Sequence, residues 1–576
     1  MSKEIDGLIQ EYTTSDNYVK SNANFHYTLS GLQSHVFTSQ LKQYSLEQYV
    51  RLGYREMAQA HVSGDLHIHN LHHAFMCGYC AGWNLTDVLQ RGLEFDGLSS
   101  LPAKHFDVAV DHMINFACSA TQEWSGAMAF GDVDTKLAPY VRRDKLSFEE
   151  VRQSIQRATW NFNYPSRFGG QSPFINWTLR MGIAKYLKGL PVSIRDEKIG
   201  MYDDFQDEIE TIDKAIFEVL NNGDSKNRPF TFPIPTIAIT KDFDWNSEIA
   251  TDLIELASAR GSPYFLNYVN YDEDSSLSMC CRLRLSLEDA KRHSGGIWNI
   301  GDSTGSIGVV TINMPRVGKL KDEKTIFEKL DSLMNLARMQ LKIKRKVITE
   351  RMNNGLLPVT KNYLRTFDNH FSTIGFVGFN EFCLNHIGTP IYGSEGQKLV
   401  IKVLKHMNEL LTEFGEEDNI LYNLEATPAE EVAGRFAKLD DYTEGFYTNS
   451  YHCPVDADLS LIERIEVESQ FHPLTTGGTV FHTFLGEKVP TDVMKKLVKR
   501  ILSNYKIAYL SMTPTLSICS KCGKNYYGIV ETCYECNAKN EVWSRIVGYY
   551  RPINRWNEAK VKEFYARIQY LQGRFE

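Results

Sequence analysis

The sequence predicts an α/β barrel that is followed by a small metal-binding module. Helical patterns at 102–160 and 201–222 alternate with apolar, strand-like stretches at 171–179 and 230–239. Alternation over this length favours a closed barrel over separate domains. With 576 residues, the chain is long enough to bury a large core. Two CxxC pairs near the C-terminus predict the module.

The composition limits the classes of function. A formal net charge of −8 argues against a general binder of nucleic acid or of anionic membranes. No apolar run approaches the ~20 residues of a membrane span, and the N-terminal residues MSKEIDGLIQEY do not form a secretory signal. Eleven cysteines, several of them in CxxC pairs, fit a reducing compartment with metal-binding and catalytic thiols. We therefore expect a cytoplasmic enzyme.

A histidine-rich stretch, GDLHIHNLHH at 64–73, follows a mainly helical N-terminal region. The HxH pattern puts His67 and His69 on one face of a strand. Such a cluster can bind a metal, but no acidic or cysteine ligand stands at a familiar spacing. Local hydrogen bonding at a strand end is therefore the favoured interpretation.

Cys77 and Cys80 form a further CxxC pair directly after the histidines. The pair is open to several interpretations: a metal site, a thioredoxin-like redox pair, one working thiol, or two buried cysteines. No second CxxC lies nearby to complete a four-sulfur site. The small and aromatic residues around the pair, in MCGYCAGWNL, indicate a strand-to-helix junction in a cavity wall.

Two adjacent cysteines, Cys280 and Cys281, stand in the segment SMCCRLRL. Because alternate residues of a strand point to opposite faces, one of them can point into a barrel. No histidine base is near in sequence, so ordinary thiolate catalysis is not indicated. Glycine-rich residues 293–301 lead to GSIGVVTINMPR at 305–316. That pattern favours either a loop that enters a crowded space or an ordinary hairpin.

The C-terminal half contains a basic helical run at 322–353, whose charges predict a solvated helix face. Further on, Thr427 is a good helix N-cap and Pro428 suits the first helical turn, with glutamates following. A helix start is also a ready anion site. This stretch is therefore either a plain capped helix or an anion-binding turn.

The end of the chain combines a metal clip with a glycine. Two CxxC knuckles stand at zinc-ribbon spacing: Cys519, Cys522, Cys533 and Cys536. Four cysteines leave no open coordination position, so a zinc ion here is predicted to be structural. Gly548 follows in the apolar, aromatic run RIVGYY. A glycine in such a run directly after a metal clip is unusual, and it indicates a loop that needs a cavity.

Together these segments resemble the large subunit of anaerobic (class III) ribonucleotide reductase, a family of glycyl radical enzymes. The resemblance runs from about Glu4 to the end of the chain. Nine motifs occur in the family's order: SNAN at 21–24, GDLHIHNL, SMCCRLRL, TINMPR, TPAE, YTNS, TGG, the paired CxxC and RIVGYYRP. One such motif is weak evidence, whereas nine in order are specific.

The resemblance implies a ten-stranded α/β barrel with a central finger loop, plus a C-terminal zinc ribbon. We expect the catalytic barrel with its N-terminal helices at 1–510, the zinc-binding domain at 511–541, and the glycyl radical loop with a C-terminal helix at 542–576. The family's N-terminal ATP-cone, roughly 90 residues or more by domain-size expectations, has no counterpart here. Either dATP does not control overall activity, or an N-terminal part is missing from the sequence.

The resemblance also assigns the chemistry. Gly548 loses a Cα hydrogen to an activase that uses a 4Fe-4S cluster and S-adenosylmethionine, and it stores the resulting radical. Cys281 passes its hydrogen atom to that radical and becomes the thiyl that takes the 3′ hydrogen of a ribonucleotide. The 2′ hydroxyl leaves as water, and Cys80 donates the reducing hydrogen. Met279 matches the family methionine two residues before the radical cysteine.

Substrate binding, proton transfer and regulation are assigned to further residues. The substrate turn is TPAE: Thr427, Pro428, Ala429 and Glu430. The backbone N–H groups of its last two residues are expected on the substrate phosphate, in the triphosphate form that the family uses. Glu425 and Glu466 are candidates for proton transfer. A specificity site for dNTP or ATP effectors is expected near 122–140, in a homodimer.

Ser306 and Ile307 depart from the formate-using members of the family, which carry an asparagine near the finger-loop tip. The departure favours the subgroup that draws electrons from a thioredoxin- or glutaredoxin-type protein. In that subgroup Cys80 and Cys281 become oxidised to a disulfide, which the redox protein reduces.

Two other functions fit parts of the sequence. A glycyl radical lyase that acts on pyruvate or a diol also has a C-terminal glycine and a thiyl cysteine, but it needs neither the zinc knuckles nor Cys80. A nucleic-acid-binding zinc ribbon should be basic. Residues 518–541 instead hold three lysines and three glutamates, so this ribbon is balanced in charge.

Overall fold

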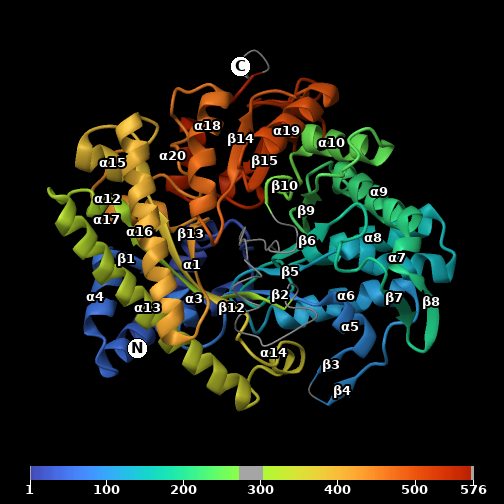
Figure 1. The fold of residues 1–576 in the computed structure, drawn as a ribbon, viewed down its shortest axis with the longest axis horizontal. Helices are drawn as coiled ribbons and strands as arrows, with labels where there is room; N and C mark the ends of the chain where they lie inside the picture. The colour runs from blue at the N-terminus through green and yellow to red at the C-terminus, as the bar shows by residue number, and fades with distance from the viewer. Residues whose placement is uncertain (1, 96, 272–302, 572–576) are drawn as a thin grey trace.

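The computed structural model describes residues 2–95, 97–271 and 303–571. At its centre lies an eleven-stranded sheet, with helices around the outside (Figure 1). Along its main path the strands follow in the order β13 (Tyr422–Ala426), β12 (His370–Val377), β11 (Gly305–Asn313), β2 (Cys80–Trp83), β5 (Met128–Phe130), β6 (Ile175–Leu179), β9 (Ile234–Ile239), β10 (Tyr264–Asn267), β15 (Tyr509–Pro514) and β14 (Phe481–Leu485).

The sheet consists of parallel groups that run in opposite directions. Strands β2, β5, β6, β9 and β10 pair in parallel. Strands β11, β12 and β13 form a second parallel group, and β14 pairs in parallel with β15. The antiparallel joints lie between β2 and β11 and between β10 and β15. The short β1 (Leu66–Ile68) adds to β11 in the antiparallel direction.

The two ends of this path meet, so the sheet closes. Glu425 of β13 forms an isolated parallel bridge with Gly478, which lies just before β14. The amide of Ala426 donates to the carbonyl oxygen of Gly478 at 3.0 Å. The ten-stranded α/β barrel that the sequence predicted is confirmed. The expected finger-loop segments at 278–285 and 293–301 lie outside the described residues.

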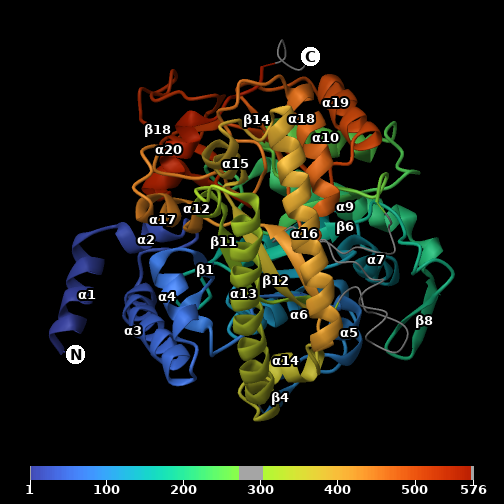
Figure 2. The same ribbon diagram turned by 60° about the vertical axis from the view of Figure 1, so that its left-hand side comes forward.

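Helices cover the outer surface of the barrel (Figure 2). The described helices are α1 (Ser2–Thr14), α2 (Asn17–Ser21), α3 (Leu29–Arg51), α4 (Arg55–Ser63), α5 (Leu85–Arg91), α6 (Phe106–Ala120), α7 (Val133–Asp144), α8 (Phe148–Asn163), α9 (Gln206–Asn222), α10 (Glu248–Arg260), α12 (Met314–Val317), α13 (Glu323–Asn353), α14 (Pro358–Tyr363), α15 (Phe379–Ile387), α16 (Ser394–Asp418), α17 (Val432–Leu439), α18 (Leu461–Phe471), α19 (Thr491–Asn504) and α20 (Glu558–Ala566). Two small hairpins pair β3 (Glu94–Phe95) with β4 (Leu98–Ser99) and β7 (Pro191–Ile194) with β8 (Glu197–Met201).

Side-chain alternation explains how the strands serve both the core and the barrel interior. On one face of β11, β12 and β13, Val310, Ile374 and Leu424 join the buried apolar cluster that includes residues of α13 and α16. The residues between them point the other way. Thr311 and Glu425 are among these and are also buried. This half of the barrel therefore has an apolar outer face and a polar interior.

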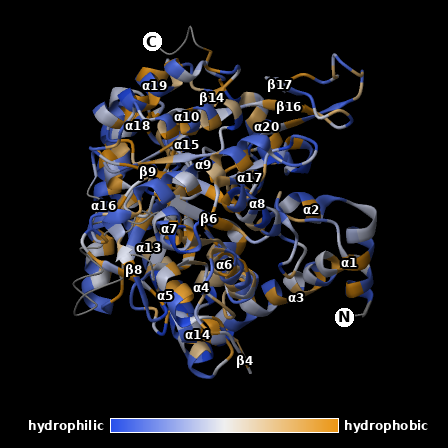
Figure 3. Cartoon of the chain, turned by 90° about the vertical axis from the view of Figure 1, so that its right-hand side faces the viewer, coloured by the Kyte–Doolittle hydropathy of each residue, from blue (hydrophilic) through white to orange (hydrophobic). Residues whose placement is uncertain are grey.

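The four predicted zinc ligands belong to a separate small sheet, with the strand order β17 (Asn525–Tyr527), β16 (Leu516–Cys519), β18 (Asn540–Arg545) and β19 (Tyr550–Pro552). It lies near α20, at the opposite end of the molecule from α14 (Figure 3). β15 crosses the predicted boundary at 511, and β18 crosses the one at 541. The glycine turn and the cysteine module therefore share one sheet.

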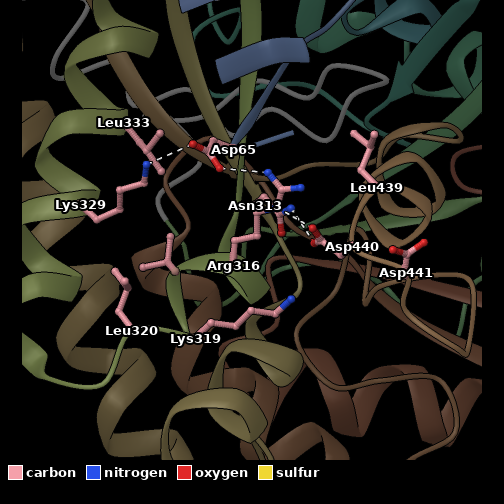
Figure 4. Close-up of a pocket in the computed structure, with 11 residues that line it drawn as sticks. Asp65, Asn313, Arg316, Lys319, Leu320, Lys329, Leu333, Leu439, Asp440 and Asp441 are labelled. Atoms are coloured by element: carbon pink, nitrogen blue, oxygen red, sulfur yellow. Dashed lines mark hydrogen bonds and ion pairs between the residues drawn. The ribbon is translucent and has the colours of Figure 1, made fainter. Parts of the chain in front are cut away.

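A polar cavity of about 470 Å³ lies outside the barrel, beside α12 and α17 (Figure 4). Arg316 pairs with Asp65 at 3.1 Å and also with Asp440. Lys329 pairs with Asp65 at 3.1 Å, and Asn313 donates to Asp440 at 3.0 Å. The positive and negative side chains of this cluster pair with one another. These ion pairs connect β1, α12, α13 and the end of α17.

The prediction of a solvated basic helix at 322–353 is correct for part of α13 only. Lys342 and Lys346 are exposed, but Lys344 is 1% exposed. The reason is that α13 packs against β11, and one side of a helix that covers a sheet is buried. Among the described residues, no helix is long and apolar enough to cross a membrane.

Candidate active site

A cavity of about 490 Å³ lies between the N-terminal helices and the barrel. Its lining includes the CxxC pair Cys77 and Cys80, the predicted substrate turn at 428–430, and Gly548. These residues come from opposite parts of the sequence, and the closed sheet brings them to one space. Three sets of residues that the sequence singled out separately therefore share a site.

Cys80 is the first residue of β2, directly opposite Ser306 of β11. Its Sγ accepts a hydrogen bond from the amide of Ala127 at 3.3 Å. Gly126 leaves room for the sulfur, because a Cβ atom at that position would lie 2.7 Å from Cys80 Sγ. The residue Cys80 is only 1% exposed, but it lines the cavity, and a reactive thiol must be accessible to the molecule with which it reacts.

Cys77 faces the same cavity. Burial raises the pKa of its thiol, while the charges of Lys344 and Arg167 and a hydrogen bond with Ser125 oppose that rise. Arg167 lines the cavity too and donates to the carbonyl oxygen of Gly126 at 3.4 Å. Burial therefore outweighs the nearby positive charges, and the Cys77 thiol is protonated at neutral pH.

Gly548 lies in the tight turn that connects β18 to β19. The turn closes through the amide of Ile546, which donates to the carbonyl oxygen of Tyr549 at 3.0 Å. The carbonyl oxygen of Gly548 accepts from Tyr264 Oη at 2.9 Å and from Arg545 Nη1 at 3.0 Å. The glycine is buried and its turn is held from two sides, so its backbone is shielded from bulk water.

The side chain of Glu430 has a structural contact of its own, apart from the predicted role of its backbone N–H group. Its carboxylate accepts hydrogen bonds from Tyr549 Oη, next to Gly548, and from the amide of Ala23 at 2.8 Å. Asn557 Nδ2 donates to the carbonyl oxygen of Glu430 at 3.0 Å. Burial raises the pKa of the Glu430 carboxyl, and the Tyr549 hydroxyl opposes the rise. The side chain thus fastens the glycine turn to the TPAE turn and the N-terminal segment.

The prediction that Thr427 caps a helix is wrong. α17 begins at Val432, and the Thr427 hydroxyl bonds instead to Thr311 Oγ1 at 2.7 Å. The Thr427 amide donates to the carbonyl oxygen of Phe376 at 3.2 Å, so the backbone continues along the edge of the sheet before the helix starts. Ala429 donates to Thr427 O at 3.2 Å. Pro428 lines the cavity within this turn.

The histidine cluster does not form the local hydrogen bonds that the sequence favoured, because the Nδ1 atoms of His67, His72 and His73 are buried without a hydrogen-bond partner among the described residues. By contrast, His69 Nε2 lies 2.8 Å from Thr311 Oγ1, and His61 Nδ1 accepts from the amide of Ile68 at 3.1 Å. Burial lowers the pKa of His69 to about 3, with Lys344 contributing. Within the described residues, the grouping of three or more metal-ligating side chains is the cysteine set of the C-terminal module.

The four cysteines of that module fit a zinc ion. Their Sγ atoms all lie within 4.8 Å of one another. Cys519 and Cys536 are 3.5 Å apart, and Cys522 and Cys533 are 3.6 Å apart. A tetrahedron with Zn–S bonds of about 2.3 Å has S···S edges of about 3.8 Å. A zinc ion would crosslink the turns at the ends of β16 and β18, and thus hold the base of the Gly548 hairpin.

Four other predicted residues either do not line this cavity or fall outside the part of the chain that the structure describes. Cys281 and Met279 lie outside the described residues. Glu425 is buried in β13, where it pairs with Gly375. The prediction that Glu466 transfers protons in the active site is wrong, because it lies on the exposed face of α18. Glu468, two residues on, is buried and pairs with Arg464 at 2.9 Å.

The prediction that Ser306 and Ile307 stand near a loop tip is also wrong. Both belong to the nine-residue strand β11, in the middle of the sheet. The Ser306 hydroxyl bonds to Thr373 Oγ1 at 2.8 Å and donates to Gly308 O at 3.1 Å. The β-branched residues that follow, such as Val309, favour a strand over a loop.

The Glu430–Tyr549 contact and the burial of Lys344 were not predicted from the sequence. The first joins residues 119 positions apart, which no local pattern can indicate. A signal existed for the second: Leu341, Lys344 and Ile348 follow the helical spacing of one buried face, so Lys344 stands at an apolar position.

The fold and the site first define a class: a ten-stranded α/β-barrel enzyme with a four-cysteine module, whose cavity combines thiols with a buried glycine turn. A family model described as "Anaerobic ribonucleoside-triphosphate reductase" matches residues 21–570. The chain therefore belongs to this family, and its activity is anaerobic ribonucleotide reduction.

Individual relatives agree with this assignment. The anaerobic ribonucleoside-triphosphate reductase of Haemophilus influenzae is 22% identical, over 99% of this chain and 86% of its own length. The enzyme of Enterobacteria phage T4 is 24% identical, over 94% and 91%. The solved structure of the Thermotoga maritima anaerobic ribonucleotide reductase with dATP and CTP has a TM-score of 0.77 at 23% identity, covering 98% of both chains.

A more remote likeness extends to a diol-type enzyme. The B12-independent glycerol dehydratase from Clostridium butyricum has a TM-score of 0.52 at 10% identity, over 99% of this chain and 78% of that one. The likeness shows a shared fold alone. It does not favour the lyase alternative over the family assignment.

Proposed function

We propose that this enzyme reduces ribonucleoside triphosphates through a radical stored on Gly548, with Cys80 as a hydrogen donor inside the cavity. One observation carries the proposal: Cys80, Gly548 and the turn at 428–430 line the same cavity. The triphosphate form of the substrate comes from the family to which the chain belongs. The substrate would lie between the thiol and the turn.

The radical steps follow from the resemblance and from the chemistry of these residues. The Gly548 Cα radical takes a hydrogen atom from the Cys281 thiol, and the resulting thiyl takes the 3′ hydrogen of the ribose. The 2′ hydroxyl takes up a proton and leaves as water. Cys80 then supplies a hydrogen atom to C2′, and a second thiol supplies the other electron and a proton, so that the two sulfurs end as a disulfide. The 3′ hydrogen returns from Cys281 at the end. A backbone radical on glycine needs shielding from water and oxygen, and the buried turn supports that role.

Substrate binding is proposed for the backbone of the TPAE turn. The turn lines the cavity, but the Glu430 carboxylate is bonded to Tyr549, which leaves phosphate recognition to main-chain N–H groups. Arg167, also on the cavity wall, supplies positive charge for an anionic substrate.

For the source of electrons we propose a thioredoxin- or glutaredoxin-type dithiol protein. The two thiols of one cavity, Cys77 and Cys80, support this choice, because a dithiol protein reduces a disulfide by thiol–disulfide exchange. Glu425 remains the proposed acidic group for proton transfer. The activase, a homodimer, a cytoplasmic location, and a dNTP or ATP site near 122–140 complete the proposal. A dATP-bound specificity site in the Thermotoga maritima enzyme supports the last of these.

An anaerobic assay with the activated enzyme, labelled CTP and a dithiol protein tests the proposed function. We expect dCTP from the wild type and from Cys118→Ser, whose thiol does not line the cavity and instead lies 3.7 Å from Ser166 Oγ. Cys80→Ser should form no dCTP. Product formation by Cys80→Ser would contradict the role of Cys80. Turnover that requires formate, followed with labelled formate, would contradict the dithiol reductant. Glycerol dehydration without dCTP would favour the lyase alternative.

A further inference from the structure

The carbonyl oxygen of Gly548 accepts hydrogen bonds from two buried side chains. Tyr264 Oη donates to it at 2.9 Å and Arg545 Nη1 at 3.0 Å. A carbonyl oxygen has two lone pairs, so these donors use its full capacity. The turn itself closes without them, because the amide of Ile546 donates to the carbonyl oxygen of Tyr549 at 3.0 Å. The two side-chain bonds therefore act on one atom, the carbonyl oxygen next to the Gly548 Cα.

Arg545 is a buried cation whose hydrogen-bond partners are neutral. It is 2% exposed, and a guanidinium stays protonated in proteins. Its Nε donates to Thr513 Oγ1 at 3.3 Å, and its Nη2 donates to the carbonyl oxygen of Gly261. Among the residues that the structure describes, no carboxylate forms an ion pair with this guanidinium. Its charge is therefore compensated by carbonyl dipoles, and that of Gly548 is one of them.

Two tyrosine rings enclose the guanidinium. Its Cζ lies 4.2 Å from the ring centroid of Tyr264 and 5.1 Å from that of Tyr550, within the range of cation–π contacts. Tyr264 is the first residue of β10, which pairs with β9 on one side and β15 on the other. The barrel therefore fixes both donors in place before any radical forms. All three side chains are buried, and a hydrogen bond in such surroundings is stronger than in water.

A radical at the Cα of a glycine changes the charge on the carbonyl oxygen beside it. The amide nitrogen releases electron density to the Cα and the carbonyl group withdraws it, so spin and negative charge spread onto the oxygen. Donors that already point at this oxygen stabilise the radical more than they stabilise the unreacted glycine. Preorganised donors that face a developing charge give enzymes much of their electrostatic stabilisation, and a cationic donor is the stronger kind.

We propose that Tyr264 and Arg545 stabilise a radical on Gly548 through their hydrogen bonds to its carbonyl oxygen. This role rests on the proposed function, in which Gly548 stores the radical. The Cα–H bond breaks and the hydrogen atom, one proton with one electron, goes to the activase. The glycine therefore stays neutral, and neither donor changes its protonation. The two side chains weaken the hold of the Cα on its hydrogen atom, which lengthens the life of the stored radical.

The hydrogen bonds can be tested in the unactivated protein, where no radical is needed. With carbon-13 in the glycine carbonyl groups and nitrogen-15 in tyrosine, nuclear magnetic resonance selects Gly–Tyr peptide bonds, and the sequence has three: 53–54, 78–79 and 548–549. The signal that Gly548→Ala lacks is that of Gly548. Loss of a hydrogen bond moves a carbonyl carbon to lower chemical shift. We expect Tyr264→Phe to move the Gly548 signal in this way and to leave the other two unchanged.

Tyr550→Phe is the matched control. It removes the hydroxyl of the other tyrosine beside Arg545, which donates to the carbonyl oxygen of Pro514 at 2.9 Å and not to that of Gly548. The Gly548 signal of this variant should stay at the wild-type position. A general loosening of the aromatic pair would move the signal in both variants, so the difference between them reports on the bond itself. An unchanged signal in Tyr264→Phe would overturn the proposal.

The effect on the radical is measured by high-field electron paramagnetic resonance of the full chain after anaerobic activation, without substrate. Hydrogen bonds to an oxygen that carries spin lower the largest g value. We expect the doublet of Tyr264→Phe to have a raised largest g value and to decay roughly fivefold faster than that of the wild type, as loss of one hydrogen bond predicts. The Tyr550→Phe doublet should match the wild type in both properties.

The role of the charge is tested by two replacements of Arg545. Arg545→Lys keeps the positive charge and Arg545→Met removes it, so the doublet of Arg545→Lys should live longer. Equal lifetimes would overturn the role of the charge, and if neither variant folds, Tyr264→Phe still decides. A wild-type doublet whose g value and lifetime are unchanged in Tyr264→Phe overturns this inference alone. A wild type without any doublet overturns the proposed function as well.

Discussion

Glu430 shows how a single side chain changes its meaning once long-range contacts are known. The sequence suggested a substrate turn, yet the carboxylate holds Tyr549 beside the glycine. The TPAE turn also lines the cavity, so a movement of this turn would be transmitted through Glu430 and Tyr549 to the Gly548 loop.

Removal of the Tyr549 hydroxyl should loosen the glycine turn. A hydrogen bond to a buried charged group is worth about 1.5–3 kcal/mol, so hydrogen exchange at 546–550 should accelerate by roughly tenfold or more in Tyr549→Phe. Tyr363→Phe is the matched control, because it removes another buried tyrosine hydroxyl, the one that donates to Gly92 O. Unchanged exchange at 546–550 in Tyr549→Phe would show that Glu430 does not hold the turn.

Gly375 permits the close contact between β12 and the start of the substrate turn. A Cβ atom there would lie 2.0 Å from Thr427 Oγ1 and 2.9 Å from Thr311 Oγ1. Gly375→Ala should therefore push the turn away, lower stability by about 1–3 kcal/mol, and raise the KM for the nucleotide. In the control Gly182→Ala, the nearest atom is Gln206 Oε1 at 3.8 Å. Chemical denaturation and steady-state kinetics measure both effects; an unchanged KM in Gly375→Ala would refute the contact's importance.

At the scale of elements, the cysteine module and the glycine hairpin act as one unit. β18 pairs with β16, which carries Cys519, and with β19, which follows Gly548. A zinc ion would hold the far end of this sheet, while Tyr264 and Arg545 hold the turn itself. A metal bound there would affect the position of the glycine through these strands.

Loss of the metal should loosen this sheet and leave the barrel intact. We expect one zinc per chain in the wild type by elemental analysis, and a much lower content in Cys522→Ser. Hydrogen exchange should accelerate in β16, β18 and β19 of the variant, with β5 and β6 unchanged. Ser520→Ala, between the first two ligands, is the control. Normal exchange in a zinc-free module would contradict the structural role of the metal.

At this scale, sequence patterns predicted an element correctly where the residues that define it are close together in the sequence. The cysteine spacing predicted the module, because four ligands must meet within a few ångströms. The strand β11 was mistaken for a loop, because its glycines were taken as loop signals. Gly308 instead stands at a register shift in the sheet, beside Lys344. Only the pairing of β1 and β2 with β11 reveals that reason.

At the scale of the whole molecule, closure of the barrel brings the residues of the site together. The prediction of a closed barrel came from the family resemblance more than from the periodicity of the sequence. Alternating strands and helices indicate a barrel but do not give the order of its strands. The meeting of β13 and β14 and the position of the N-terminal segment against Tyr549 follow from the closed sheet. Contacts between Asn22 and Tyr549 span nearly the whole chain, so no local pattern could have predicted them.

Stability of the whole molecule should fall in mild acid. Burial lowers the pKa of several histidines to about 3 or 4: His26, His61, His69, His73, His370 and His452. In the unfolded chain they titrate near 6.5, so the unfolded state binds more protons below that pH. The contribution of these neutral histidines is complete above pH 6.5 and is lost as the pH falls towards their folded pKa values.

Each such histidine lowers the free energy of unfolding by about 1.4 kcal/mol for every pH unit below 6.5. Urea unfolding at pH 7.5, 6.5 and 5.5 should show a loss of stability over the second interval that is about three times the loss over the first. Replacement of one member, as in His370→Phe, should reduce the slope by about one proton. Constant stability down to pH 5.5 would contradict the burial of neutral histidines.

The central claim is that Gly548 stores the radical that drives ribonucleotide reduction. The most direct test is electron paramagnetic resonance of the protein after anaerobic treatment with an activase and S-adenosylmethionine. We predict a doublet from the single remaining Cα hydrogen, which collapses when the protein contains α-deuterated glycine and is absent from Gly548→Ala. A doublet that persists in Gly548→Ala would contradict the claim.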